Sequence, residues 1–128
     1  MSGNDSVIGA ELRSRVKDLR QTAEKEYSCS MGFDPGFRGF EGHFEGNPIV
    51  PGVCLIETAR VVAETVLGRS LATRRVPQCR FRRPIFAEDR AEVKLKLEAV
   101  EPGTWKLNAD IRVGGVICAQ LRSNAEEL

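Results

Sequence analysis

Apolar side chains cover nearly the whole circumference of the segment formed by residues 51–67. Their spacing predicts a long helix that Pro51 opens at its first turn and Gly68 closes. A helix that is apolar on all sides is stable only when other structure packs around it. We therefore expect this helix to lie at the centre of the fold. Its apolar positions are Val53, Cys54, Leu55, Ile56, Ala59, Val61, Val62, Ala63, Val66 and Leu67.

Three segments after this helix alternate apolar and polar residues, which indicates strands with one buried face. Pro102-Gly103 and Gly114-Gly115 separate them as turns, so they form an antiparallel meander. A shorter strand over residues 76–81 and another over residues 27–33 complete the set. The economical packing is α+β: one antiparallel sheet curled around one buried helix. The alternating positions are Ala91, Val93, Leu95, Leu97 and Ala99, then Trp105, Leu107, Ala109, Ile111 and Val113, then Ile117, Ala119 and Leu121.

The N-terminal stretch is strongly charged, with Ile8, Leu12, Val16 and Leu19 at helical spacing. It predicts an amphipathic helix, or a loosely attached arm, over about residues 6–22. A chain of 128 residues and 14.1 kDa is one domain, near the size at which dimerisation commonly buries more surface. We expect one domain over residues 1–128, with the charged helix or arm in 1–24 and the core in 25–123.

Charge and cysteine spacing exclude several classes of function. A net charge of +1 gives no reason to expect nucleic-acid binding. No apolar run is as long as a membrane span and the start does not resemble a secretory signal, so we expect a cytoplasmic protein. The four cysteines lack the paired spacing of zinc or redox motifs, so we expect reduced core residues and no metal. They are Cys29, Cys54, Cys79 and Cys118.

The chain's only histidine, His43, lies in a glycine-rich loop over residues 34–47. We expect Phe37, Phe40 and Phe44 to hold this loop in one shape, because glycines alone would leave it free. Imidazole has the unperturbed pKa nearest neutrality, so a histidine in a rigid loop is a candidate base. The alternative is a loop histidine that only hydrogen-bonds to backbone.

A polar stripe interrupts the otherwise apolar helix. Glu57, Arg60 and Glu64 follow one another at i, i+3 and i+7, so they share one face. Two interpretations remain open. The stripe is either solvated and held by weak ion pairs, or it faces an internal cleft.

A long ordered motif carries a family resemblance. It reads Gly42-His43-Phe44-x-Gly46-x-Pro48-Ile49-Val50-Pro51-Gly52-Val53, with Glu57 fourteen positions after His43 and Phe81-Arg82-Arg83-Pro84 further on. This pattern resembles the β-hydroxyacyl-acyl-carrier-protein dehydratases of the FabZ type, which have the hotdog fold, from about Tyr27 to Leu121. The resemblance implies conversion of (3R)-hydroxyacyl thioesters on acyl carrier protein to trans-2-enoyl thioesters and water. It also implies that His43 and Glu57 meet across a dimer interface.

Dehydration itself explains these residue types. The reaction needs a base for the proton at C2, for which His43 is suited, and a proton source for the leaving hydroxyl, for which Glu57 is suited. It also needs donors for the charge that develops on the thioester oxygen. The backbone N–H groups of Gly52 and Val53, at the start of the helix, have no intrahelical partner and lie at the positive end of its dipole. They are the candidate oxyanion donors.

Basic residues cluster around the strand that follows the helix. Acyl carrier proteins are strongly acidic, so such a patch would steer them toward the site. The alternative is a solvated strand edge that resists aggregation. The docking candidates are Arg74, Arg75, Arg82 and Arg83. We further expect a homodimer or a trimer of dimers, and no cofactor.

Departures from the family pattern keep two alternatives open. Glu45 stands where the family usually has proline, and Val61 stands where it usually has glutamine. These changes suggest a divergent member with a specialised pathway. One alternative is a hotdog acyl thioesterase, which would use a carboxylate and water, although the spacing of His43 and Glu57 favours dehydration. The other is a non-catalytic acyl-carrier or acyl-binding module, and Glu45 and Val61 keep this alternative open.

Overall fold

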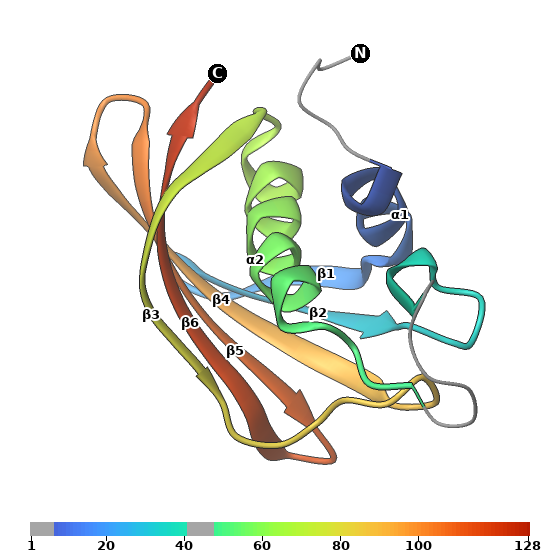
Figure 1. Ribbon diagram of the computed structural model, residues 1–128. Coiled ribbons are helices and arrows are strands. Elements are labelled where there is room, and N and C mark those ends of the chain that lie inside the picture. The colour runs from blue at the N-terminus through green and yellow to red at the C-terminus, as the bar shows by residue number, and fades with distance from the viewer. Residues whose placement is uncertain (1–6, 41–47) are drawn as a thin grey trace.

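The computed structural model describes residues 7–40 and 48–128 and has the hotdog fold, as expected. One six-stranded sheet curls around helix α2 (Gly52–Leu67), and helix α1 (Val7–Arg15) lies beside α2 (Figure 1). The strands run in the order β1-β2-β4-β5-β6-β3, and every neighbouring pair is antiparallel. The other elements are β1 (Lys17–Ala23), β2 (Glu26–Gly32), the 3-10 turn η1 (Arg38–Phe40), β3 (Leu71–Phe81), β4 (Arg90–Glu101), β5 (Thr104–Val113) and β6 (Val116–Glu127).

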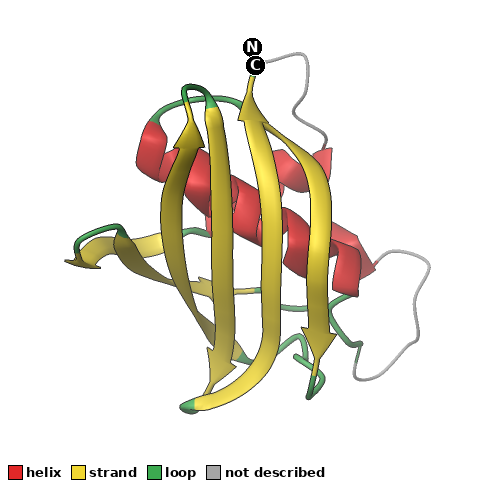
Figure 2. Ribbon diagram, turned by 90° about the vertical axis from the view of Figure 1, so that its left-hand side faces the viewer, coloured by secondary structure: helices red, strands yellow, loops and turns green. Residues whose placement is uncertain are grey.

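Helix α2 begins and ends where its sequence predicts. Pro51 is the N-cap in an extended conformation. Gly68 follows the last turn with φ 65° and donates its N–H to the carbonyl of Glu64 at 2.8 Å. The middle of the helix, residues 58–64, is buried throughout. Figure 2 shows the strands crossing over α2, so the expectation of a central helix is confirmed.

The core lies between α2 and the concave face of the sheet. Alternate residues of β4 are buried, including Val93 and Leu95, which is the period of a strand with one inward face. Leu107 and Ile111 of β5 are fully buried in the same cluster, as is Val62 of α2. The meander is confirmed, and its Gly-containing turns have the positive φ that glycine tolerates, 79° at residue 103 and 58° and 80° at 114 and 115.

The expected N-terminal helix over residues 6–22 is wrong beyond Arg15. The chain turns at Asp18, which has φ 54°, and continues as strand β1, which pairs with β2. This pairing satisfies backbone N–H and C=O groups of β2 that would otherwise face an open edge. Leu12 is fully buried and Leu19 packs partly against the core, so the apolar residues do face inward. They do so from two different elements.

Two other expectations need correction. Strand β3 begins at Leu71, earlier than the expected start at Val76, and β6 runs on to Glu127. The four cysteines are free, as expected, but Cys79 is exposed rather than part of the core. Burial raises the pKa of the Cys29 thiol to about 11. Among the described residues no helix is both long and apolar enough to cross a membrane.

The end of α2 generates a prediction about stability. Gly68→Ala should lower the free energy of unfolding by about 1 kcal/mol, because alanine is strained at positive φ. The matched control is Gly32→Ala, since φ there lies outside the left-handed region and a Cβ would meet no atom within 4 Å. Urea denaturation of both variants measures the difference. Equal stability of the two would contradict the role assigned to the left-handed residue.

Candidate active site

The start of α2 is held against the chain that leaves β3. Ile49 forms an isolated antiparallel bridge with Phe86. On either side of it, Val50 donates its N–H to Ile85 O at 2.7 Å, and Ala87 donates to Pro48 O at 3.3 Å. These bonds join the segment before α2 to the segment after β3, so the first turn of α2 has a defined position relative to the end of β3.

Two backbone donors are free at this helix start. Cys54 and Leu55 donate their N–H groups to Pro51 O, at 2.9 and 3.3 Å. Within the described part of the chain, the N–H groups of Gly52 and Val53 donate no hydrogen bond. They lie at the positive end of the helix dipole, which favours a negatively charged oxygen. Among the described residues, these two N–H groups therefore lack an intrahelical partner, which is the property that made them candidate oxyanion donors in the sequence.

A pocket of about 270 Å³ opens beside these donors. The ring of Phe81 covers Gly52 so closely that a Cβ there would lie 2.6 Å from it. Phe81 is half exposed. Glycine at position 52 therefore leaves room for this ring against the first turn of α2. The pocket is lined by Ile49, Val50, Gly52, Leu55, Phe81, Arg82, Arg83, Pro84 and Ile85.

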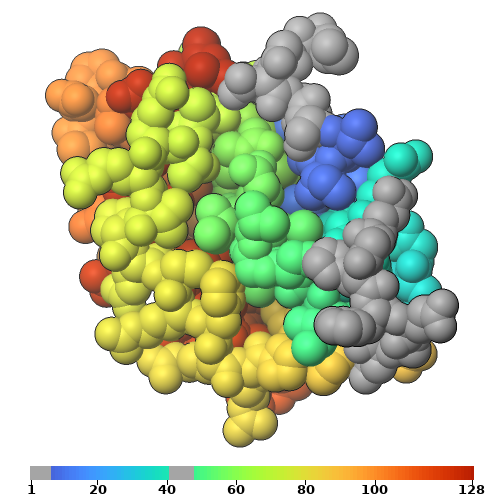
Figure 3. Space-filling view, in the orientation of Figure 1, coloured from blue at the N-terminus to red at the C-terminus, as the bar shows by residue number. Residues whose placement is uncertain are grey.

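Glu57 lies one turn beyond Val53 on the same face of α2. Val53 is exposed, and the Glu57 side chain is 30% exposed. The surface of α2 is visible between β3 and α1 in Figure 3. Arg60 contacts one carboxylate oxygen of Glu57, with Nε at 2.7 Å and Nη2 at 2.6 Å from Oε2.

The polar stripe continues into the interior as a chain of alternating charges. Nη1 of Arg60 lies 2.9 Å from Oε2 of Glu64, which also accepts the N–H of Leu71 at 2.7 Å. Arg13 of α1 donates to the other oxygen of Glu64. Arg60 and Glu64 are each only 6% exposed. The expected ion pairs do form. The interpretation as a solvated stripe is nevertheless wrong for Arg60 and Glu64, because α1 packs against α2 and buries them.

His43, Glu45 and Phe44 lie outside the described residues. The part of the loop before them is held as expected, because Phe37 and Phe40 are buried. Phe37 meets the rings of Phe33 and Phe40 edge to face, with centroids 5.3 Å apart in both pairs. In the described ranges, no group of three or more His, Cys, Asp or Glu side chains is placed to hold a metal ion.

The basic residues divide into two groups. Arg82 and Arg83 line the pocket beside α2, and both donate their N–H groups to Cys118 O, at 2.7 and 3.2 Å. Arg74 lies toward the other end of β3, where it pairs with Glu126 at 3.1 Å, and Arg75 is exposed next to it. Seven residue steps along a strand span about 20 Å, so the four arginines do not form one patch.

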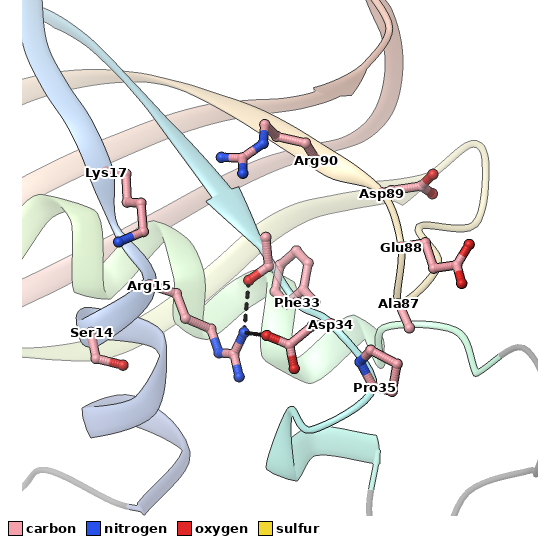
Figure 4. Close-up of a pocket in the computed structure, with 11 residues that line it drawn as sticks. Ser14, Arg15, Lys17, Phe33, Asp34, Pro35, Ala87, Glu88, Asp89 and Arg90 are labelled. Carbon is pink, nitrogen blue, oxygen red and sulfur yellow. Dashed lines mark hydrogen bonds and ion pairs between the residues drawn. The ribbon is translucent and has the colours of Figure 1, made fainter.

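A second pocket, of about 460 Å³, lies apart from this site between α1, the end of β2 and the start of β4 (Figure 4). Arg15 donates there to Gly32 O at 3.0 Å and to Asp34 at 2.7 Å. The hydrogen bond from Arg15 holds the pKa of Asp34 below its usual range. These bonds tie α1 to the loop that follows β2, and the pocket shares no lining residue with the pocket at Gly52.

Comparison with protein families gives a match over most of the chain. The model of the ApeI-like family, which is described as ApeI dehydratase, matches residues 19–120. The chain is 37% identical over 90 residues to 3-hydroxyacyl-[acyl-carrier-protein] dehydratase FabZ of Acidiphilium cryptum, covering 63% of this chain and 54% of that protein. It is 33% identical over 90 residues to FabZ of Paramagnetospirillum magneticum, covering 63% and 56%. The chain spans about half the length of the curated relatives it matches.

Solved structures share the fold at lower identity. The dehydratase heterocomplex ApeI:P from Xenorhabdus doucetiae superposes with a TM-score of 0.70 at 20% identity, covering 87% of this chain and 96% of that chain. A hypothetical thioesterase with coenzyme A from Streptococcus pneumoniae TIGR4 gives 0.65 at 12% identity, covering 87% and 84%. Because dehydratases and thioesterases share this architecture, the fold alone does not decide between them.

Sequence reasoning singled out Glu57 and treated Arg60 only as its partner in a weak, solvated ion pair. The spacing of Arg60, three residues after Glu57, was a visible signal for a pair on one helix face. The residue at the family's glutamine position, Val61, is fully buried and has no polar side-chain atom. The polar contact to Glu57 comes from Arg60 and not from position 61.

The buried charges predict a large effect on stability. Glu64→Gln keeps the shape of the side chain but removes the charge that Arg60 and Arg13 both contact. It should lower the free energy of unfolding by about 3 kcal/mol, because it leaves a buried guanidinium poorly compensated. Glu126→Gln is the matched control, since it breaks a solvent-exposed pair with Arg74 and should cost less than about 0.5 kcal/mol. Chemical denaturation measures both, and similar losses would contradict the distinction.

Proposed function

Because the chain belongs to the ApeI-like dehydratase family, we propose that it removes water from (3R)-3-hydroxyacyl thioesters on acyl carrier protein and yields trans-2-enoyl thioesters. The observation that carries the proposal is the start of α2. Two free backbone N–H groups lie there, beside a pocket and one turn from a half-buried carboxylate. Elimination next to a thioester carbonyl needs this combination of groups.

The proposed chemistry uses one base, one acid and two donors. His43 takes the proton from C2, and the electron pair of that C–H bond forms the C2=C3 double bond. The C3–O bond breaks, and the hydroxyl leaves as water with a proton from Glu57. The N–H groups of Gly52 and Val53 donate to the thioester oxygen, which gains negative charge as the C2 proton leaves. Transfer of the proton from His43 back to Glu57 restores the starting state.

We propose further that the site is shared between two copies of the chain, with His43 of one copy meeting Glu57 of the other. Three large apolar side chains are exposed around the start of α2: Val53 at 66%, Phe81 at 52% and Ile49 at 49%. Strand β3 is an edge of the sheet beside them. An exposed strand edge next to exposed apolar side chains favours burial in an isologous dimer.

The shared site predicts complementation between inactive variants. His43→Ala and Glu57→Gln should each reduce turnover of a hydroxyacyl thioester by about 10²–10⁴-fold, because each removes a proton-transfer group. Random subunit exchange makes half of the dimers hybrids, each with one intact pair. The mixture should therefore recover about a quarter of the parent activity. Absorbance of the conjugated enoyl thioester follows the reaction.

Two results would count against this model. Exchange demonstrated by mass spectrometry without recovery of activity would exclude a pair formed across an interface. Release of free thiol without the enoyl absorbance would indicate thioester hydrolysis in place of dehydration. The melting temperatures of both variants should stay within a few degrees of the parent, which controls for misfolding.

We also propose that Arg82 and Arg83 steer the acidic carrier protein to the pocket they line. Changing both to Glu should lower kcat/KM on carrier-bound substrate by about tenfold, because long-range attraction governs encounter. Short thioesters that lack the carrier should be turned over at the parent rate. The control is the same charge change at Arg74 and Arg75, which lie within β3 and are remote from the pocket. Equal losses with both pairs, or on both substrates, would remove the docking assignment.

A further inference from the structure

One oxygen of the Glu57 carboxylate is held and the other is left open. Both donors that Arg60 directs at Glu57, Nε and Nη2, contact Oε2, at 2.7 and 2.6 Å. Within the described residues, Oε1 accepts no hydrogen bond. The side chain is 30% exposed, so this second oxygen has access to a ligand.

Arg60 is itself held in place from the side opposite to Glu57. Its third nitrogen, Nη1, contacts Glu64 at 2.9 Å, and the Arg60 side chain is only 7% exposed. The Glu64 oxygen that Arg60 contacts is itself fixed by the backbone N–H of Leu71 at 2.7 Å, whereas Arg13 contacts the other oxygen. A planar guanidinium that is bound at both edges cannot turn without breaking a charged contact in the interior. Arg60 is therefore a rigid support for Glu57.

We propose that Arg60 is a positioning residue, which holds Oε2 of Glu57 so that Oε1 faces the 3-hydroxyl of the substrate. The inference rests on the proposed dehydratase function, and Arg60 touches no reacting atom. Its effect is to remove rotamers of Glu57 that would direct the proton elsewhere. Groups held in productive geometry by a supporting shell gain rate through orientation.

Steady-state kinetics test this role. Arg60→Gln should lower kcat by about 10- to 100-fold with KM within about twofold of the parent, because orientation of the acid matters in the transition state. Arg60→Lys keeps the positive charge but loses the planar set of guanidinium donors, so its kcat should lie between those of Arg60→Gln and the parent. The matched control is Arg13→Gln, which loses a contact to Glu64 and leaves the contact between Arg60 and Glu57 in place.

The control separates positioning from stability. At a temperature where all variants are folded, Arg13→Gln should keep kcat within about twofold of the parent. An equal fall of kcat in folded Arg13→Gln would overturn the proposal, because the loss would then follow the integrity of the charge cluster. A rise in KM with unchanged kcat in Arg60→Gln would also overturn it, since that pattern marks lost substrate binding.

A double-mutant cycle tests the pair without any substrate. Glu57→Gln, Arg60→Gln and the double variant should be non-additive by about fivefold or more in the unfolding equilibrium constant. Additive effects would overturn the proposal whether or not the chain turns over a thioester. Absence of dehydration by the unaltered chain would instead contradict the proposed function. The two failures are therefore distinguishable.

Discussion

The burial of α2 inside the curled sheet is the constraint on which the rest of the structure depends. The middle of the helix, residues 58–64, is buried throughout, and it can be so only because β4, β5, β6 and β3 bend around one side while α1 covers another. In the first turn Val53 is exposed, whereas Cys54 and Leu55 are buried. One helix thus has a buried middle and a first turn at which, among the described residues, the N–H groups of Gly52 and Val53 donate no hydrogen bond.

Local patterns were sufficient for the elements whose cause is local. The helix α2 follows from its apolar circumference together with Pro51 and Gly68, and the meander follows from alternation and Gly-containing turns. Strand β1 could not be predicted in this way. Leu12, Val16 and Leu19 fit a helical period, and the need of β2 for a neighbouring strand appears only once the sheet is assembled. The exposure of Cys79 likewise depends on which face of β3 turns outward.

The same distinction between local and long-range causes applies to the candidate site. Sequence spacing indicated that Glu57, Arg60 and Glu64 share a face, but it could not decide whether water covers that face. The answer lies in α1, which brings Arg13 against Glu64 from a distant part of the chain. For the arginines, closeness in sequence was wrongly taken to mean closeness in space. Arg74 and Arg82 are close in sequence, yet an extended strand places them far apart.

A buried charge cluster in a small domain needs a reason other than stability. Desolvation of Arg60 and Glu64 offsets much of what their attraction supplies, and well-packed apolar residues at such positions are often as stable or more so. Helix α2 is rich in apolar residues elsewhere, so leucine or methionine at positions 60 and 64 would suit the packing. What apolar residues could not do is direct a fork of donors at one oxygen of a half-exposed carboxylate. The cluster is therefore better explained by the orientation of Glu57 than by the cohesion of the fold.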